Sequence, residues 1–186
     1  MKKLAKRIFR FKIILYKHLS SCKNIIGMPK IIQPSLFLGE GKIEFGNNVM
    51  LGYSPSPYVY SGSMHIEARW DDSYVKIDDN TTINNNLVII AEHKSITIGA
   101  NCLIGYNVQI LNSDFHHIDI ENRNKPNAPC SNIAIGNNVW LGSNVTILKG
   151  VSIGDNSVIG TGSIVNANIT ANTVAVGIPA KVVKHL

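Results

Sequence analysis

Two adjacent histidines, in the segment SDFHHID at residues 113–119, are the side chains best suited to proton transfer. The unperturbed pKa of imidazole lies near neutrality, so either ring could accept a proton from a hydroxyl group at physiological pH. The alternative is that His116 and His117 are exposed loop residues without a catalytic role. Three carboxylates could orient a catalytic imidazole, and the sequence does not choose among them: Asp114, Asp119 and Glu92.

A zinc site is a second interpretation of these histidines. Side chains of adjacent residues on an extended backbone point in opposite directions, whereas a zinc ion needs separated ligands that converge. The third ligand would have to be His93 or a more distant histidine. We therefore expect no metal ion.

The histidines interrupt a six-residue repeat that dominates the chain. From residue 135 the sequence reads IGNNVW, LGSNVT, ILKGVS, IGDNSV, IGTGSI and VNANIT, with an aliphatic residue at the start of each unit. The same phase occurs upstream at Ile77, Ile83, Ile89, Ile98, Ile104 and Ile110, and more weakly at Phe45 and Leu51. A period of six fits neither a helix nor simple strand alternation, but it fits a polygonal coil of short strands. Three units would close one turn of a triangular prism, with Gly and Asn at the corners.

The repeat predicts one main domain. The 186 residues are 45% hydrophobic and 16% charged, which excludes a mainly disordered chain. We assign residues 31–186 to an all-β coil, with a loop at about 111–134 that carries the histidines and with a C-terminal cap. Residues 53–73 contain two prolines and break the repeat, so we expect an insertion or an irregular coil there.

Residues 1–30 form a separate basic segment. They hold nine of the 18 Lys and Arg residues and none of the 12 acids, so the rest of the chain is mildly acidic. Apolar residues at helical spacing predict an amphipathic helix: Leu4, Ile8, Phe11, Leu15 and Leu19. Such a helix could rest on the anionic inner membrane surface, or its apolar face could pack on the coil as a cap. Nucleic-acid binding is not expected, because the basic surface of residues 1–30 does not extend into the rest of the chain.

Cysteine usage and hydropathy predict a cytoplasmic location. The three cysteines show no CxxC spacing, which favours neither a disulfide framework nor a zinc knuckle. The opening residues are too interrupted by charge for a signal peptide, and no apolar run is long enough to span a membrane.

These motifs resemble the hexapeptide-repeat acyltransferases, enzymes built on a left-handed parallel β-helix. The resemblance covers about residues 75–184 and is most specific in three places: SDFHHID, the repeats at residues 135–165, and GIPAKVVK at residues 177–184. It is strongest to enzymes that O-acetylate galactosides, maltose, Nod factors and bacterial surface polysaccharides. The resemblance implies acetyl-CoA as co-substrate, a saccharide acceptor and a homotrimer with active sites between neighbouring β-helices.

The same resemblance implies roles for individual residues. His116 aligns with the family's general base, and Ser143 with a residue that stabilises the oxyanion at the thioester carbonyl. The other residues that align with the coenzyme groove are Trp140, Gly142, Gly160, Thr161, Lys181 and Lys184. The residues assigned to the acceptor are Asn84, Glu92, Asp114 and His117. A structural explanation stays open for two of these groups, because Trp140 could pack at a corner and the lysines could be solvated surface charges.

One departure from the galactoside enzymes concerns the coenzyme. Asn166 and Ala167 stand where those enzymes carry a Thr-Lys pair, so one basic contact is absent. We nevertheless expect an acetyl-CoA-dependent O-acetyltransferase that acts on a saccharide hydroxyl by direct transfer. The alternatives are N-acetylation of a free or nucleotide-linked amino sugar, and a non-catalytic trimeric scaffold, because a solenoid alone does not determine function.

Overall fold

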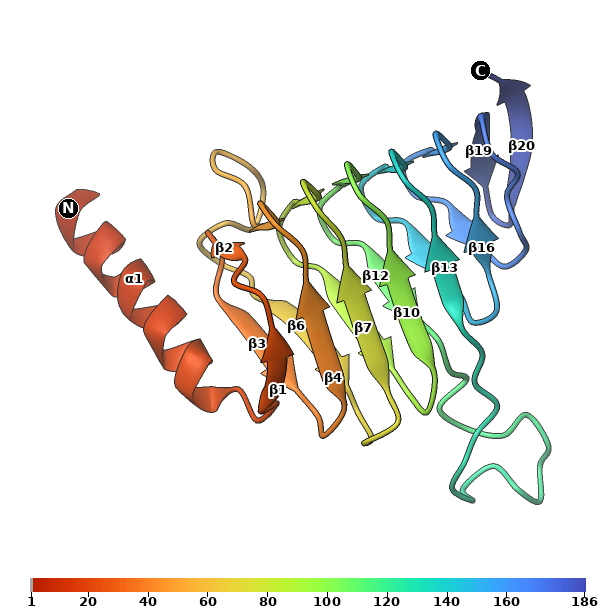
Figure 1. Ribbon diagram of the computed structural model, residues 1–186, viewed down its shortest axis with the longest axis horizontal. Helices are drawn as coiled ribbons and strands as arrows, with labels where there is room; N and C mark the ends of the chain where they lie inside the picture. Colours follow the sequence, from red (N-terminus) through yellow and green to blue (C-terminus); the bar gives the residue numbers. More distant parts are fainter. Residues whose placement is uncertain (1) are drawn as a thin grey trace.

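The computed structural model describes the backbone of residues 2–186 and the side chains from Arg7 onward. The side chains of Lys2, Lys3, Leu4 and Lys6, which belong to the predicted amphipathic helix, lie outside the described residues. One helix, α1 (Lys2–Leu19), is followed by twenty short strands that wind into a three-sided parallel β-helix (Figure 1). The predicted fold class is confirmed.

Each side of the prism is one sheet. Sheet A contains β1 (Asn24–Ile26), β4 (Lys42–Phe45), β7 (Tyr74–Ile77), β10 (Ser95–Ile98), β13 (Ile133–Ile135) and β16 (Ser152–Ile153). Sheet B contains β2 (Lys30–Ile31), β5 (Met50–Leu51), β8 (Thr82–Ile83), β11 (Leu103–Ile104), β14 (Trp140–Leu141), β17 (Val158–Ile159), β19 (Thr173–Gly177) and β20 (Ala180–His185). Sheet C contains β3 (Ser35–Leu38), β6 (Met64–Ala68), β9 (Val88–Ala91), β12 (Gln109–Leu111), β15 (Thr146–Ile147) and β18 (Ile164–Val165).

The leading aliphatic residues of the repeats form the core. Each stacks on its equivalent in the next coil, because the parallel pairing keeps one register through the sheet. The inward rows are Ile77, Ile98, Ile135 and Ile153 in sheet A; Ile83, Ile104, Leu141 and Ile159 in sheet B; and Ile89, Ile110, Ile147 and Val165 in sheet C, all at most 4% exposed. Burial of these β-branched side chains accounts for the strict period of six.

Asparagine makes the corners. Eight corner residues have φ between 54° and 59°, in the left-handed region that asparagine tolerates better than most residues: Asn48, Asn80, Asn101, Asn107, Asn138, Asn144, Asn156 and Asn172. Their amides also join neighbouring coils, as where Asn107 Nδ2 donates to Asn144 Oδ1 at 2.8 Å. The high asparagine content therefore follows from the corner geometry.

The β-helix departs from the sequence-based expectation in two places. It begins at β1, within the segment assigned to the helix and its linker, so the coils extend further back than expected. Residues 53–73 do not form one irregular coil, because β6 pairs regularly with β3 and β9. The irregular part is the corner between β5 and β6, where Asn85 Nδ2 donates to the carbonyl oxygens of Tyr53 and Pro57.

The two ends of the prism are closed differently (Figure 1). At the C-terminal end β20 folds back antiparallel on β19. At the other end α1 packs against β3 of the first coil, and Ile13 and Tyr16 are half-buried. Phe9 meets Tyr60, in the corner between β5 and β6, with ring centroids 5.0 Å apart. The predicted apolar face does not make this contact: Ile8, Phe11, Leu15 and Leu19 are exposed. No helix within residues 2–186 is long and apolar enough to cross a bilayer.

Candidate active site

The catalytic loop predicted at about residues 111–134 is residues 112–132 of the structure, between β12 and β13, and it leaves the prism at the edge between sheets C and A (Figure 1). Its base is closed by a bridge between Ser113 and Cys130 and by the N–H of Ser131, which donates to the carbonyl of Asn112 at 2.9 Å. The rigid coil thereby fixes both ends of a loop that has little regular structure of its own. Such a loop on a rigid support suits a reaction site.

His116 is exposed in this loop, and one of its ring nitrogens is occupied. Its Nδ1 lies 3.2 Å from the carbonyl oxygen of Arg123. A carbonyl only accepts, so this bond requires a proton on Nδ1 and leaves the lone pair of Nε2 free in the neutral ring. His117 has the opposite arrangement, because its Nε2 lies 3.1 Å from the carbonyl of Pro126. The neighbouring histidines therefore differ in which nitrogen can accept a proton.

None of the three carboxylates considered as orienting groups bonds to His116 in the described structure. Asp114 pairs with Lys149 Nζ at 3.3 Å, and Asp119 accepts a hydrogen bond from Asn122. Glu92 lies one coil earlier, beside Arg69. The imidazole is oriented by a backbone carbonyl, a contact that no sequence pattern reveals.

Phe115, directly before His116, adopts an unusual backbone conformation. Its φ is 59°, in the left-handed region that bulky residues rarely enter. Two contacts hold it there: its N–H donates to Ser113 Oγ at 2.9 Å, and the Arg69 guanidinium lies 5.3 Å from its ring centroid. Sequence reasoning missed both residues, since Arg69 belongs to no repeat position or motif and Phe115, although it lies within SDFHHID, carries no group that could transfer a proton.

Glu92 and Asn112 form a buried polar pair at the base of the loop. The N–H of Glu92 donates to Asn112 Oδ1 at 2.7 Å, while Glu92 Oε2 and Asn112 Nδ2 are buried without a hydrogen-bond partner. Arg69 Nη1 lies 3.5 Å from Glu92 Oε2, which is an ion pair but too long for a good hydrogen bond. The base of the loop thus contains one acceptor and one donor that are buried without a hydrogen-bond partner.

Glu67 balances the charge of Arg69 in this cluster. Arg69 Nε donates to Glu67 Oε1 at 2.7 Å, and His65 Nε2 lies 2.8 Å from Glu67 Oε2. Burial by itself would raise the pKa of Glu67, but these two hydrogen bonds outweigh it and hold the pKa below its usual range. Arg69 is therefore held between the carboxylates of Glu67 and Glu92.

The residues assigned to the coenzyme gather at the other edge of sheet C, where it meets sheet B. Trp140 projects outward from β14, and register pairs it with Val158, then Val174, then Lys184. Side chains paired in this way lie on one face, so Trp140 and Lys184 are about 14 Å apart on the outside of sheet B. Lys181 lies opposite Val176 on the same hairpin. Gly142, Ser143, Gly160 and Thr161 occupy the adjoining B–C corners.

Two of these residues have a structural reason of their own. A Cβ at Gly142 would lie 2.6 Å from the backbone nitrogen of Thr161, and one at Gly160 would lie 2.5 Å from Val176 Cγ1. Close packing against the backbone of the next coil therefore requires glycine at 142, whether or not a coenzyme binds, whereas a side chain at 160 would require Val176 to move. The exposed Trp140, by contrast, is 55% accessible, so corner packing does not explain it.

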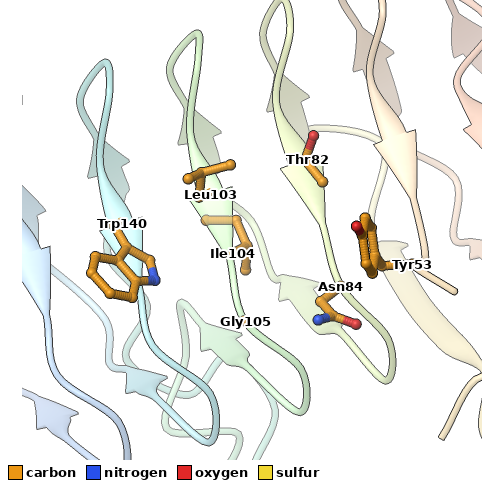
Figure 2. A pocket seen from close by; sticks show the side chains of 7 residues that line it. All are labelled: Tyr53, Thr82, Asn84, Leu103, Ile104, Gly105 and Trp140. Atoms are coloured by element: carbon orange, nitrogen blue, oxygen red, sulfur yellow. The ribbon is translucent and has the colours of Figure 1, made fainter. Parts of the chain in front are cut away.

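Asn84 lies on the same B–C edge, in a groove of about 220 Å³ that runs across several coils (Figure 2). Tyr53 and Trp140 stand at opposite ends of the groove, and Leu103 lies between them. The groove is lined by Tyr53, Thr82, Asn84, Leu103, Ile104, Gly105 and Trp140.

The structure thus separates the predicted site into two groups. His116, His117, Asp114 and Glu92 belong to the C–A edge. Asn84 and Ser143 belong to the B–C edge with the other corner residues, and Trp140 and the two lysines lie on sheet B. The whole width of sheet C lies between the two groups in one chain. Within residues 2–186, no cluster of three or more His, Cys, Asp or Glu side chains is arranged to hold a metal ion.

Two families of hexapeptide-repeat proteins match parts of the chain. The family of bacterial transferase hexapeptide repeats matches residues 132–167, and the hexapeptide repeat of succinyl-transferase matches residues 95–110. The polysialic acid O-acetyltransferase of Neisseria meningitidis is 41% identical over 70 residues, which are 37% of this chain and 32% of that protein. This chain therefore aligns with about a third of that relative's length.

Two longer matches cover most of the chain. The Escherichia coli K12 protein named "Putative lipopolysaccharide biosynthesis O-acetyl transferase WbbJ" is 34% identical over 161 residues, which are 81% of this chain and 76% of that protein. The crystal structure of a hexapeptide-repeat acetyltransferase of Vibrio cholerae complexed with acetyl coenzyme A covers 98% of this chain and 85% of its own, with 25% identity and a TM-score of 0.59. The six-residue repeat, the prism that it builds and these relatives agree that the chain belongs to the hexapeptide-repeat acetyltransferases.

Proposed function

We propose that the protein is an acetyl-CoA-dependent O-acetyltransferase that acetylates a saccharide hydroxyl, with His116 as the general base. The observation that carries this proposal is the bond from His116 Nδ1 to the Arg123 carbonyl, which leaves Nε2 free to accept a proton. A base needs a fixed ring and an accessible lone pair, and exposed His116 has both.

The proposed chemistry is a direct transfer. His116 Nε2 removes the proton of the acceptor hydroxyl as its oxygen attacks the thioester carbonyl. Ser143, through its backbone N–H or hydroxyl, stabilises the negative charge on the former carbonyl oxygen. When the tetrahedral intermediate collapses, the C–S bond breaks and the imidazolium returns its proton to the departing thiolate. The products are an acetyl ester and CoA with a free thiol.

The separation of the two residue groups supports a site shared between subunits of a trimer. The outer face of sheet A is polar, with ion pairs such as Lys42 with Glu44 and Lys76 with Asp78. The outer face of sheet C carries apolar side chains in β9 and β12, the strands nearest the loop: Val88, Ile90 and Leu111. The next strand, β6, presents His65 and Glu67 outward. A neighbouring subunit packed on sheet C would bring its own B–C edge to the His116 loop.

The acceptor is proposed to be a unit of a surface polysaccharide or its precursor. The two relatives named above act, by their names, on polysialic acid and in lipopolysaccharide biosynthesis. A cytoplasmic location belongs to the same proposal, in keeping with three free cysteine thiols.

Thiol release from acetyl-CoA, measured with and without a panel of saccharides and amino sugars, tests the proposal. We expect acceptor-dependent release by the wild type, a loss of about two to four orders of magnitude in His116→Gln, and no loss in the matched control His18→Gln. Hydroxylamine then cleaves an ester product but not an amide, which separates O- from N-acetylation. Undiminished release by His116→Gln would refute the role of His116, and absence of acetyl-CoA binding would favour a scaffold.

A further inference from the structure

The N-terminal helix has two apolar faces, and only one of them is used. Phe9, Ile13 and Tyr16 lie on the side that packs on the first coil, and the bond from the Phe37 N–H to Ser20 Oγ, 3.0 Å long, joins the helix end to β3. The second face contains large side chains that are between 40% and 64% exposed: Ile8, Phe11, Ile14, Leu15 and Leu19. Figure 1 shows α1 at the end of the prism, with no other element on its far side.

Positive charge surrounds this second face. At helical spacing Lys12 borders the stripe on one side, and Arg10 and Lys17 border it on the other. Arg7 lies within the stripe, between Ile14 and Phe11. The first acidic residue of the chain is Glu40, so no carboxylate of the first 39 residues offsets these charges. A helix of 18 residues, about 27 Å long, thus presents an apolar stripe with a basic border.

We infer that this second face of α1 docks the protein on an anionic lipid bilayer, with the helix axis parallel to the membrane surface. The apolar stripe enters the boundary between headgroups and acyl chains, and the basic border contacts the anionic headgroups. The inner face of the helix remains on the β-helix, so docking needs no rearrangement of the fold. The inference does not depend on the proposed reaction.

Two other occupants fit the charges less well. A second copy of the chain would bring an identical basic helix without a carboxylate to pair with it, so like charges would meet. A nucleic acid would satisfy the basic border but would leave the apolar stripe in water. An anionic bilayer satisfies both parts of the face at once.

Vesicle co-sedimentation of the full chain tests this inference. The probes are vesicles of phosphatidylcholine alone and vesicles of equal parts phosphatidylcholine and phosphatidylglycerol. The wild type should sediment with the anionic vesicles only, and high salt should weaken the binding. The double variant Phe11→Gln/Leu15→Gln should lose at least about tenfold in partitioning, and Arg7→Gln/Arg10→Gln should lose binding to a smaller extent.

Met28→Gln is the matched control, because Met28 is 94% exposed at the same end of the prism but lies outside the helix. It should bind as the wild type does, and circular dichroism should show that all variants keep the fold. Equal sedimentation of Phe11→Gln/Leu15→Gln and wild type would overturn the inference. The inference would also be overturned if the wild-type protein stayed in the supernatant with anionic vesicles. In that case, a lower oligomer mass for Phe11→Gln/Leu15→Gln than for the wild type would identify the face as a contact between copies of the chain.

Discussion

The guanidinium of Arg69 lies over the ring of Phe115, 5.3 Å from its centroid, and so joins the corner after β6 to the residue that precedes His116. Arg69 also pairs with Glu67 and Glu92, which come from two successive coils. One side chain therefore ties the loop to the rigid prism at the point where the backbone of Phe115 has a positive φ.

Replacement of Arg69 should loosen the loop more than the prism. In Arg69→Met the carboxylates of Glu67 and Glu92, both largely buried, lose their cation, which should destabilise the fold by about 1–3 kcal/mol. Arg69→Lys keeps the charge but not the contact of the guanidinium with the Phe115 ring, so it should recover stability more fully than activity. Urea unfolding and acetyl-transfer kinetics of the two variants measure this difference. If Arg69→Met had the same acetyl-transfer activity as the wild type, Arg69 would not be needed to position the loop.

Acid should weaken the fold through Glu67. Its pKa is lower in the folded than in the unfolded chain, so its contribution to the free energy of unfolding is complete above the ordinary value of about 4.3. That contribution is lost as the pH falls through the lowered folded value. Glu67→Gln should therefore be less stable at neutral pH and show a weaker loss of stability on acidification.

Urea midpoints at neutral pH and at about pH 3.5 check the prediction for Glu67. The exposed Glu40 provides the control, since Glu40→Gln should leave the pH dependence unchanged. The prediction would be contradicted if Glu67→Gln lost as much stability as the wild type between neutral pH and about pH 3.5.

The corner asparagines should be replaceable by glycine more readily than by alanine. Asn156 has a φ of 59° and bonds to Asn138 and Asn172 at 2.9 and 2.8 Å. Both substitutions lose these bonds, but only alanine also meets the steric penalty of the left-handed conformation. Asn156→Ala should thus be less stable than Asn156→Gly by about 1 kcal/mol. At Ser152, in the extended strand β16, the order of alanine and glycine should be reversed.

The sequence predicts the coil well and the site only in part. Buried aliphatic residues recur every six positions, so Ile135, Leu141 and Ile147 predict one strand in each of the three sheets. This prediction requires no information about contacts between residues distant in the sequence. The orientation of the His116 ring depends on the backbone carbonyl of Arg123. Every residue has such a carbonyl, so the sequence cannot show which one bonds to the histidine. If the helix is a cap, hydrophobicity predicts that the face with Ile8, Phe11 and Leu15 is the one that packs on the coil, but these residues are exposed. The helix packs through Phe9, Ile13 and Tyr16, because α1 has apolar residues on more than one side.

A shared site predicts complementation between two inactive variants. His116→Ala lacks the base but keeps the coenzyme groove, whereas Thr161→Trp, at an exposed B–C corner, blocks the groove but keeps the base. If each site combines the loop of one subunit with the groove of its neighbour, equal co-expression should place a good loop against a good groove at about one site in four. The whole co-expressed population should then show about a quarter of wild-type activity, and purified mixed trimers about a third, because each has one good pair among its three sites. The two variants purified separately and assayed together without subunit exchange should show none. Absence of activity in co-expressed, mass-verified mixed trimers would mean that loop and groove of the same chain must cooperate, contrary to the separation of these groups across sheet C.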